Sequence, residues 1–231
     1  MTDFAKYAFN KSHAAAYAVV SYQTAWLKYY YPVEYMAALM TSVIDNPGKV
    51  AEYIYSCRQM GIKILPPDIN HGYSSFSVDN GSIRYGLAAI KSIGRPVIKE
   101  IVAERKANGE FKNLKDFIER MSGKDINKRT IENFIKSGAF DELGGTRKQF
   151  MVIYVQILDQ VNREKKNSMT GQMSLFDIVG EEQKSEFDIP LPNVGEYEKS
   201  TKLAFEKEVL GIYLSAVSYT HLRAHETEAD L

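Results

Sequence analysis

The feature that most constrains this chain is a short apolar stretch with a glycine, followed at once by a proline. Residues 87–94 read Leu-Ala-Ala-Ile-Lys-Ser-Ile-Gly, which predicts a short helix that ends in a tight turn at Gly94. Pro96 suits the first position of a helix, and apolar residues then recur at helical spacing. The sequence therefore predicts two helices joined by a hairpin.

This hairpin has the chemistry of a phosphate-binding turn. A glycine at the bend lets a phosphate approach the backbone N–H groups, and the next helix adds unpaired N–H groups and its positive end. The pattern resembles the helix-hairpin-helix, which binds the DNA backbone. It predicts contacts through Lys91, Ser92, Ile93, Gly94 and Arg95. A plain pair of helices with a glycine bend is the alternative.

The charges are unevenly distributed, although the 29 basic and 29 acidic residues cancel. Residues 72–148 hold 15 Lys and Arg against 10 Asp and Glu, whereas residues 149–231 hold 8 against 14. The basic part is thus centred on the hairpin, which fits an anionic partner, although a solvated face can carry such an excess too.

The remaining patterns predict a mainly α fold with one small β-hairpin. An apolar helix from about Ala14 to Tyr30 should be buried, because it is apolar nearly all round, with Asn10 or Ser12 as its cap. Asn80-Gly81 predicts a type I′ turn between two strands. The further helix caps and stops are Pro32, Pro47, Gly61, Asn113, Asn127, Gly138 and Thr146.

The composition argues against several classes of protein. Cys57 is the only cysteine, which excludes a disulfide framework and a cysteine zinc site and fits the reducing cytoplasm. No signal peptide or membrane-spanning run is apparent. Asp45, Asp68 and Asp79 stand in separate turns, so no carboxylate set for two metals is visible, which disfavours a small nucleotide-processing enzyme.

Several long motifs stand in a fixed order along the chain. They are Phe9-Asn-Lys-Ser-His-Ala-Ala-Ala-Tyr17, Tyr22-Gln-Thr-Ala-Trp-Leu-Lys28, Ile64-Leu-Pro-Pro-Asp-Ile-Asn70, Ile83-Arg-Tyr-Gly-Leu-Ala-Ala-Ile-Lys91 and Ile135-Lys-Ser-Gly-Ala-Phe-Asp141. Together they resemble the bacterial replicative DNA polymerase III α subunit, a C-family polymerase, over about residues 4 to 215. A free-standing module of paired helix-hairpin-helix units is the runner-up, but it would not need the apolar first 60 residues.

The resemblance implies the following division of an internal fragment. Residues 1–63 would be the C-terminal part of the fingers, 64–148 a tandem helix-hairpin-helix domain, 149–166 an amphipathic helix, 167–199 a flexible tether, and 200–215 a helix leading to a missing barrel domain. Residues 216–231 depart from the family and resemble translated adapter sequence, so we assign no metal to their two histidines.

The family also implies roles for residues at the start of the chain. Lys11, Ser12, His13 and Tyr17 would lie near the incoming nucleotide. The residues alone favour a structural reading, in which Ser12 is a cap, His13 a satisfied polar side chain and Tyr17 a core residue. The polymerising acids and their Mg²⁺ belong to a palm domain that this chain lacks, so we expect the chain to hold no catalytic residue, metal or cofactor and to have no activity alone.

A last motif lies in the tether. Gln172, Leu175 and Phe176 have the spacing of the peptide by which bacterial polymerases bind the sliding clamp, although the apolar pair could instead fold back onto the preceding helix. The partners implied are primer-template DNA, deoxynucleoside triphosphates, the clamp and other replicase subunits, with no membrane.

Overall fold

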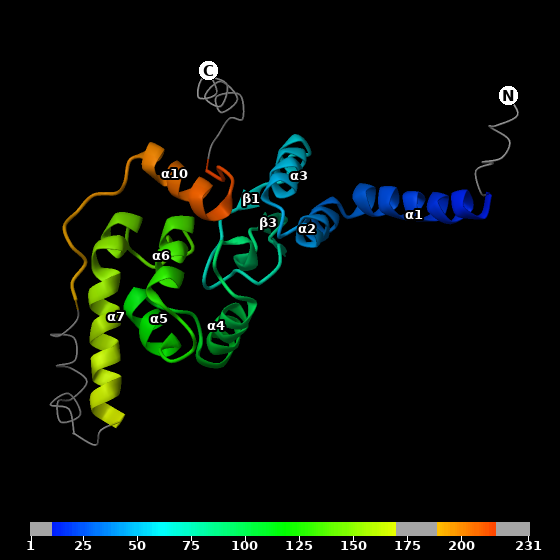
Figure 1. The fold of residues 1–231 in the computed structure, drawn as a ribbon. Helices are drawn as coiled ribbons and strands as arrows, with labels where there is room; N and C mark the ends of the chain where they lie inside the picture. The colour runs from blue at the N-terminus through cyan, green and yellow to red at the C-terminus, as the bar shows by residue number, and fades with distance from the viewer. Residues whose placement is uncertain (1–10, 170–188, 216–231) are drawn as a thin grey trace, which may run out of the picture.

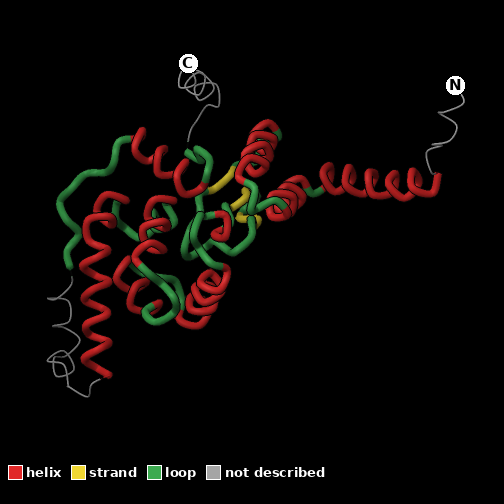
Figure 2. The backbone as a smooth tube through the Cα atoms, in the orientation of Figure 1, coloured by secondary structure: helices red, strands yellow, loops and turns green. Residues whose placement is uncertain are grey.

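The computed structural model describes residues 11–169 and 189–215, and within them the chain is mainly helical (Figures 1 and 2). The α-helices are α1 Lys11–Tyr30, α2 Pro32–Ser42, α3 Pro47–Gln59, α4 Arg95–Asn108, α5 Leu114–Met121, α6 Lys128–Ser137, α7 Arg147–Met169 and α10 Lys199–Leu210. A 3-10 helix, η2, spans Leu87–Ala89, and the strands are β1 Ile64–Leu65, β2 Ser77–Asp79 and β3 Ser82–Arg84. The predicted fold class, mainly α with one small β-hairpin, is confirmed.

The small sheet has the order β1-β3-β2, with β1 parallel and β2 antiparallel to β3. Asn80 and Gly81 join β2 to β3 and have φ values of 49° and 75°. Positive φ at both central residues defines the predicted type I′ turn. The sheet leads directly into η2 and the hairpin that precedes α4.

A cluster of phenylalanine rings holds α5, α6 and the start of α7 together. Phe117 packs edge-on against Phe134 and Phe140, and Phe140 against Phe150. All four side chains are fully buried. Edge-to-face packing of this kind adds to the stability that comes from burying apolar area. The cluster therefore forms the core that joins these three helices.

Three of the helix caps predicted from single residues, Asn113, Asn127 and Thr146, are present. Asn113 accepts a hydrogen bond from the N–H of Asp116 at 2.8 Å, and Asn127 accepts one from the N–H of Thr130 at 2.9 Å. Thr146 exchanges hydrogen bonds with Gln149 at the start of α7. Each satisfies N–H groups that the first turn of a helix leaves unpaired.

The prediction that the first helix is buried is wrong. Helix α1 has no buried residue, and Tyr22 and Tyr29 are 71% and 78% exposed. Figure 1 shows α1 extending away from the body, and its C-terminal end adjoins α2. The helix also begins at Lys11, so Ser12 lies inside it and is not its cap. Within the described residues, no other element covers the apolar side chains that surround α1.

Some predicted features lie outside the described residues. These are Asn10 as a cap, the peptide that contains Gln172, Leu175 and Phe176, and the tail 216–231. In the part of the chain that is described, no helix is both long and apolar enough to cross a membrane.

Candidate nucleic-acid interface

The hairpin before α4 is built differently from the prediction in one respect. The left-handed residue is Ser92, with φ 63°, whereas Gly94 is extended, with φ −75° and ψ 142°, and is the N-cap of α4. The first arm is the single turn of η2 rather than an α-helix. The bend therefore lies two residues earlier than predicted, and Gly94 marks the start of the second helix.

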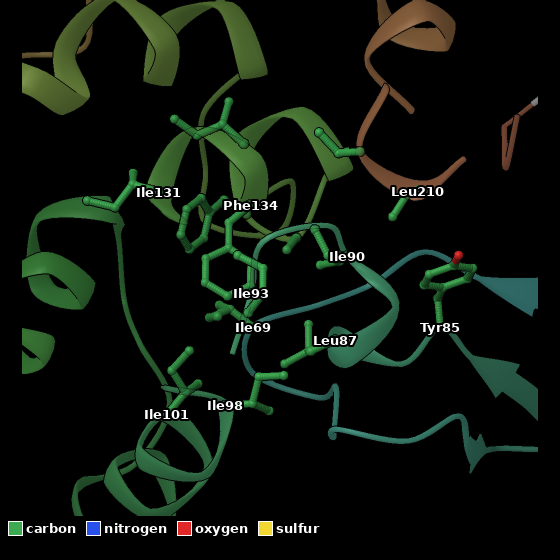
Figure 3. Close-up of a cluster of buried hydrophobic side chains, with 14 of the residues drawn as sticks. Ile69, Tyr85, Leu87, Ile90, Ile93, Ile98, Ile101, Ile131, Phe134 and Leu210 are labelled. Atoms are coloured by element: carbon green, nitrogen blue, oxygen red, sulfur yellow. The ribbon is translucent and has the colours of Figure 1, made fainter. Parts of the chain in front are cut away.

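The hairpin is anchored by its isoleucines. Ile90 and Ile93 are 1% and 7% exposed. Figure 3 shows both pointing inward, with Ile93 beside Phe134 of α6 and Ile69. Alternating with them, Lys91, Ser92, Gly94 and Arg95 are exposed. Burial of two side chains thus holds the loop while its backbone faces outward.

Several N–H groups of this loop remain available for a ligand. Among residues 11–169 and 189–215, the N–H groups of Ser92, Gly94 and Arg95 make no hydrogen bond. The N–H of Ile93, which the sequence placed among the contacts, donates instead to the carbonyl of Ile90 at 3.3 Å. Unpaired N–H groups at the start of a 14-residue helix favour an anion, and the helix dipole adds to this.

The space above Gly94 is open. A Cβ added there would meet Pro96 Cδ at 3.6 Å, an ordinary contact, and the φ of Gly94 suits any residue. The fold therefore does not require a glycine at this position. The absence of a side chain instead leaves the loop backbone accessible, which is what a phosphate needs.

The charges near the hairpin are weakly engaged. Arg95 Nη2 lies 3.7 Å from Asp45 Oδ2, and the two side chains are 68% and 86% exposed. An ion pair as exposed as this contributes little to stability. Arg95 is thus able to exchange Asp45 for a phosphate, and Lys91 stands exposed on the other side of the bend.

A second glycine bend, at residues 135–138, echoes the first in sequence but is closed. Gly138 is left-handed, with φ 83°, and a Cβ there would collide with Arg147 and lie 2.8 Å from Asp141 Oδ2. Lys136 is paired with Glu132 and Glu208. This bend is part of the core, so we assign no ligand contact to it.

The residues predicted to lie near a nucleotide are all on α1, away from the hairpin. Lys11, Ser12, His13 and Tyr17 are exposed, and the rings of His13 and Tyr17 are in contact at a centroid distance of 4.4 Å, with their planes tilted by 52°. Tyr17 is 61% exposed, so the alternative that it is a core residue is wrong. The helix brings these side chains together without enclosing a site.

The described residues do not fit a catalytic metal. Nowhere in residues 11–169 and 189–215 do three or more His, Cys, Asp or Glu side chains converge on a point that could hold an ion. The Mg²⁺ that the resemblance implies therefore finds no ligand set among them, and we derive no reaction step through it.

Two features of the hairpin were missed by sequence analysis. Asn133 donates to the carbonyl oxygen of Lys91 at 2.7 Å, and Val209 accepts from the N–H of Lys91 at 2.8 Å. Asn133 lies on the buried face of the amphipathic helix α6 and is 7% exposed. Asn133 could have been found from the sequence, because it is a polar residue at a core-facing position. The carbonyl of Val209 could not, because a backbone carbonyl leaves no mark in the sequence.

Comparison with known proteins agrees with this geometry. Residues 61–150, which include the hairpin, match the family model described as a helix-hairpin-helix motif. Over 92% of its length the chain is similar to proteins described as DNA polymerase III subunit alpha. The identity is 42% with the protein of Mycobacterium leprae, 43% with that of Vibrio cholerae and 44% with that of Haemophilus influenzae.

The chain spans 18% of the length of these curated relatives. The resemblance drawn from the sequence motifs is thus confirmed for this segment of the subunit.

Proposed function

We propose that this chain, similar over nearly all its length to one part of the DNA polymerase III α subunit, binds the backbone of duplex DNA without reading its sequence. Phosphates would accept hydrogen bonds from the N–H groups of Ser92, Gly94 and Arg95, and Lys91 and Arg95 would neutralise their charge. The substrate of the whole enzyme would be the primer-template duplex that passes over this surface.

The observation that carries this proposal is the open hairpin. Its backbone faces solvent with unpaired N–H groups, Gly94 is a glycine that the fold does not need, and two cations flank it. Exposed N–H groups of this kind bind water in the free chain, and their position at the start of α4 beside two cations lets a phosphate replace that water.

A salt titration of duplex binding tests the proposal. Gly94→Val should weaken binding by more than about ten-fold, because its branched side chain covers the N–H groups. Gly195→Val is the matched control, since a Cβ there meets nothing within 4 Å and Gly195 precedes α10, whose first residue lies about 15 Å along the helix from Val209. Equal affinity of wild type and Gly94→Val would show that the hairpin is not the contact.

For the parent enzyme we propose DNA-directed DNA polymerase activity, with this chain contributing to it but polymerising nothing alone. The carboxylates of the described residues are scattered, which supports the proposal that this chain polymerises nothing alone. Purified chain, incubated with Mg²⁺, a primed template and all four deoxynucleotides, should leave the primer unextended. Extension of the primer would overturn this.

The exposed helix α1 supports a role in contacting the incoming nucleotide. The proposal is that Lys11, Ser12, His13 and Tyr17 form one wall of a pocket that the rest of the polymerase completes. In the intact polymerase, His13→Ala and Tyr17→Ala should raise the nucleotide KM or lower turnover while DNA affinity stays normal. An effect on thermal stability alone, with unchanged kinetics, would contradict this role.

Clamp attachment through Gln172, Leu175 and Phe176 is a separate proposal. Leu175 and Phe176 would fill an apolar pocket of the clamp, with Gln172 hydrogen-bonding at its rim. A peptide of residues 170–178 should bind the host clamp with a Kd on the order of micromolar, because it orders few residues. Binding should disappear when both Leu175 and Phe176 are replaced by alanine, and no binding at high micromolar clamp would exclude the motif.

A further inference from the structure

Lys91, the first residue of the exposed hairpin, has its backbone fixed from two sides. Its N–H donates to the carbonyl oxygen of Val209 at 2.8 Å, and its own carbonyl oxygen accepts from Asn133 Nδ2 at 2.7 Å. Asn133 comes from α6 and Val209 from the last turn of α10. Two helices that are distant in sequence thus fix the two peptide groups on either side of the Lys91 Cα atom.

The next residue explains why this support is needed. Ser92 is left-handed, a conformation that is costly for residues other than glycine and that persists where the surroundings impose it. The two hydrogen bonds to Lys91 fix the chain on the N-terminal side of Ser92. Burial of Ile93 fixes it on the other side.

We infer that Asn133 is a positioning residue for DNA binding. With the end of α10, it holds the hairpin in the conformation that presents the N–H groups of Ser92 and Gly94 together. This inference rests on the proposed DNA binding. Asn133 is buried and acts through the carbonyl of Lys91, without touching DNA itself.

Helix α10 belongs to the same support. Lys136 of α6 pairs with Glu208 at 2.7 Å, next to Val209. Figure 3 shows Leu210 beside the loop that carries Ile90. Helix α10 therefore packs beside the hairpin and completes it, so the proposed DNA-binding surface is not contained in residues 61–150 alone.

The test compares DNA affinity of the full chain and its variants below their melting temperatures, using one blunt duplex oligonucleotide. Asn133→Ala should weaken binding about five-fold, the effect of one lost hydrogen bond, with the same salt dependence because no cation is removed. Asn70→Ala is the matched control. Asn70 bridges the backbone of Phe111 through two hydrogen bonds of 2.9 and 2.8 Å, so the variant should lose stability and keep its affinity.

A double variant shows whether Asn133 acts through the hairpin. In the Gly94→Val background, where the hairpin contact is lost, Asn133→Ala should cause no further loss of affinity. Additive losses, or unchanged affinity of Asn133→Ala alone, would overturn the inference. Equal DNA binding by wild type and Gly94→Val would instead show that the proposed DNA binding through the hairpin is wrong.

One measurement needs no variant and covers the case in which Asn133→Ala fails to fold. In the free wild-type chain the amide hydrogen of Lys91 should exchange slowly with solvent, because it is bonded to Val209. Exchange as fast as that of the neighbouring Ser92 amide would overturn the inference as well.

Discussion

The bend at residues 90–94 reads Ile-Lys-Ser-Ile-Gly and the bend at 135–138 reads Ile-Lys-Ser-Gly, yet the two face different surroundings. In both, the carbonyl oxygen of the lysine is held by a distant side chain, Asn133 for Lys91 and Arg147 for Lys136. In the first bend the rest of the backbone is open to solvent. In the second it is covered.

The cover of the second bend is Arg147, which is 5% exposed. It donates to Asp141 at 2.8 and 3.0 Å and to the carbonyl of Lys136 at 3.1 Å, and its Nη1 lies 3.5 Å from the buried Glu206. These partners raise the pKa of Arg147 against the opposing effect of burial, so it stays charged. A glycine bend is therefore accessible to a ligand only where the surrounding fold leaves it uncovered.

The largest contrast is expected in stability. Gly138→Ala should lower the free energy of unfolding by about 3 kcal/mol, because the left-handed conformation penalises a side chain and the new Cβ displaces Arg147. Gly94→Ala should change it by less than about 1 kcal/mol, since the site is open and extended. Urea unfolding of both variants measures this, and equal losses would contradict the comparison.

The two lysines should differ in DNA binding. Lys91→Ala should weaken duplex binding about five-fold and reduce the slope of log K against log salt by about 0.9, the effect of one phosphate contact. Lys136 is paired with Glu132 and Glu208, which raise its pKa although burial opposes this. Lys136→Ala should therefore lower stability by about 1 kcal/mol and leave the salt slope unchanged. If Lys91→Ala and Lys136→Ala reduced the salt slope equally, the assignment of the phosphate contact to Lys91 would be wrong.

A smaller effect is expected at the acid beside the open bend. Asp45→Asn removes the carboxylate 3.7 Å from Arg95, so duplex affinity should rise about two-fold at low salt and the gain should fade as salt screens it. Asp159→Asn, which removes an exposed partner of Lys128, should leave affinity unchanged. Fluorescence anisotropy at two salt concentrations distinguishes them, and a gain in both variants would point to net charge alone.

The smallest effect concerns the far end of α4. Hydrogen bonds from Lys124, Asn108 and Arg120 lower the pKa of Glu104 from 4.5 to about 2. A carboxyl whose folded pKa is depressed stabilises the protein above pH 4.5, and this contribution disappears as the pH falls through 2. Melting temperatures from about pH 6 to about pH 2 should therefore fall more steeply for wild type than for Glu104→Gln. Parallel curves would show that these hydrogen bonds do not depress the pKa of Glu104.

Local signals in the sequence predicted local structure well. The cap at Asn127 and the turn at Asn80-Gly81 follow from backbone chemistry within a few residues, and both are present. The hairpin itself was also placed correctly, although its left-handed residue is Ser92 rather than Gly94. That shift depends on the bonds of Lys91 to Asn133 and Val209, which are long-range and have no local signature.

The exposure of α1 and the closure of the second bend were also beyond the sequence. An apolar helix such as α1 predicts burial, but the pattern does not say whether the covering surface is present. Likewise, Gly138 and Gly94 stand in similar local sequences, and only the position of Arg147 separates them. Contacts between distant residues decide such cases, so structure was needed to distinguish the open bend from the covered one.

The most direct test of the central claim is a titration of the isotope-labelled full chain with duplex DNA, monitored by backbone amide NMR. The amide signals of Ser92, Gly94 and Arg95 should shift strongly as phosphates accept their hydrogen bonds, whereas those of Lys136 and Gly138 should stay in place. Unmoved signals at residues 92–95, or an equal response of both bends, would show that the open bend is not the DNA contact.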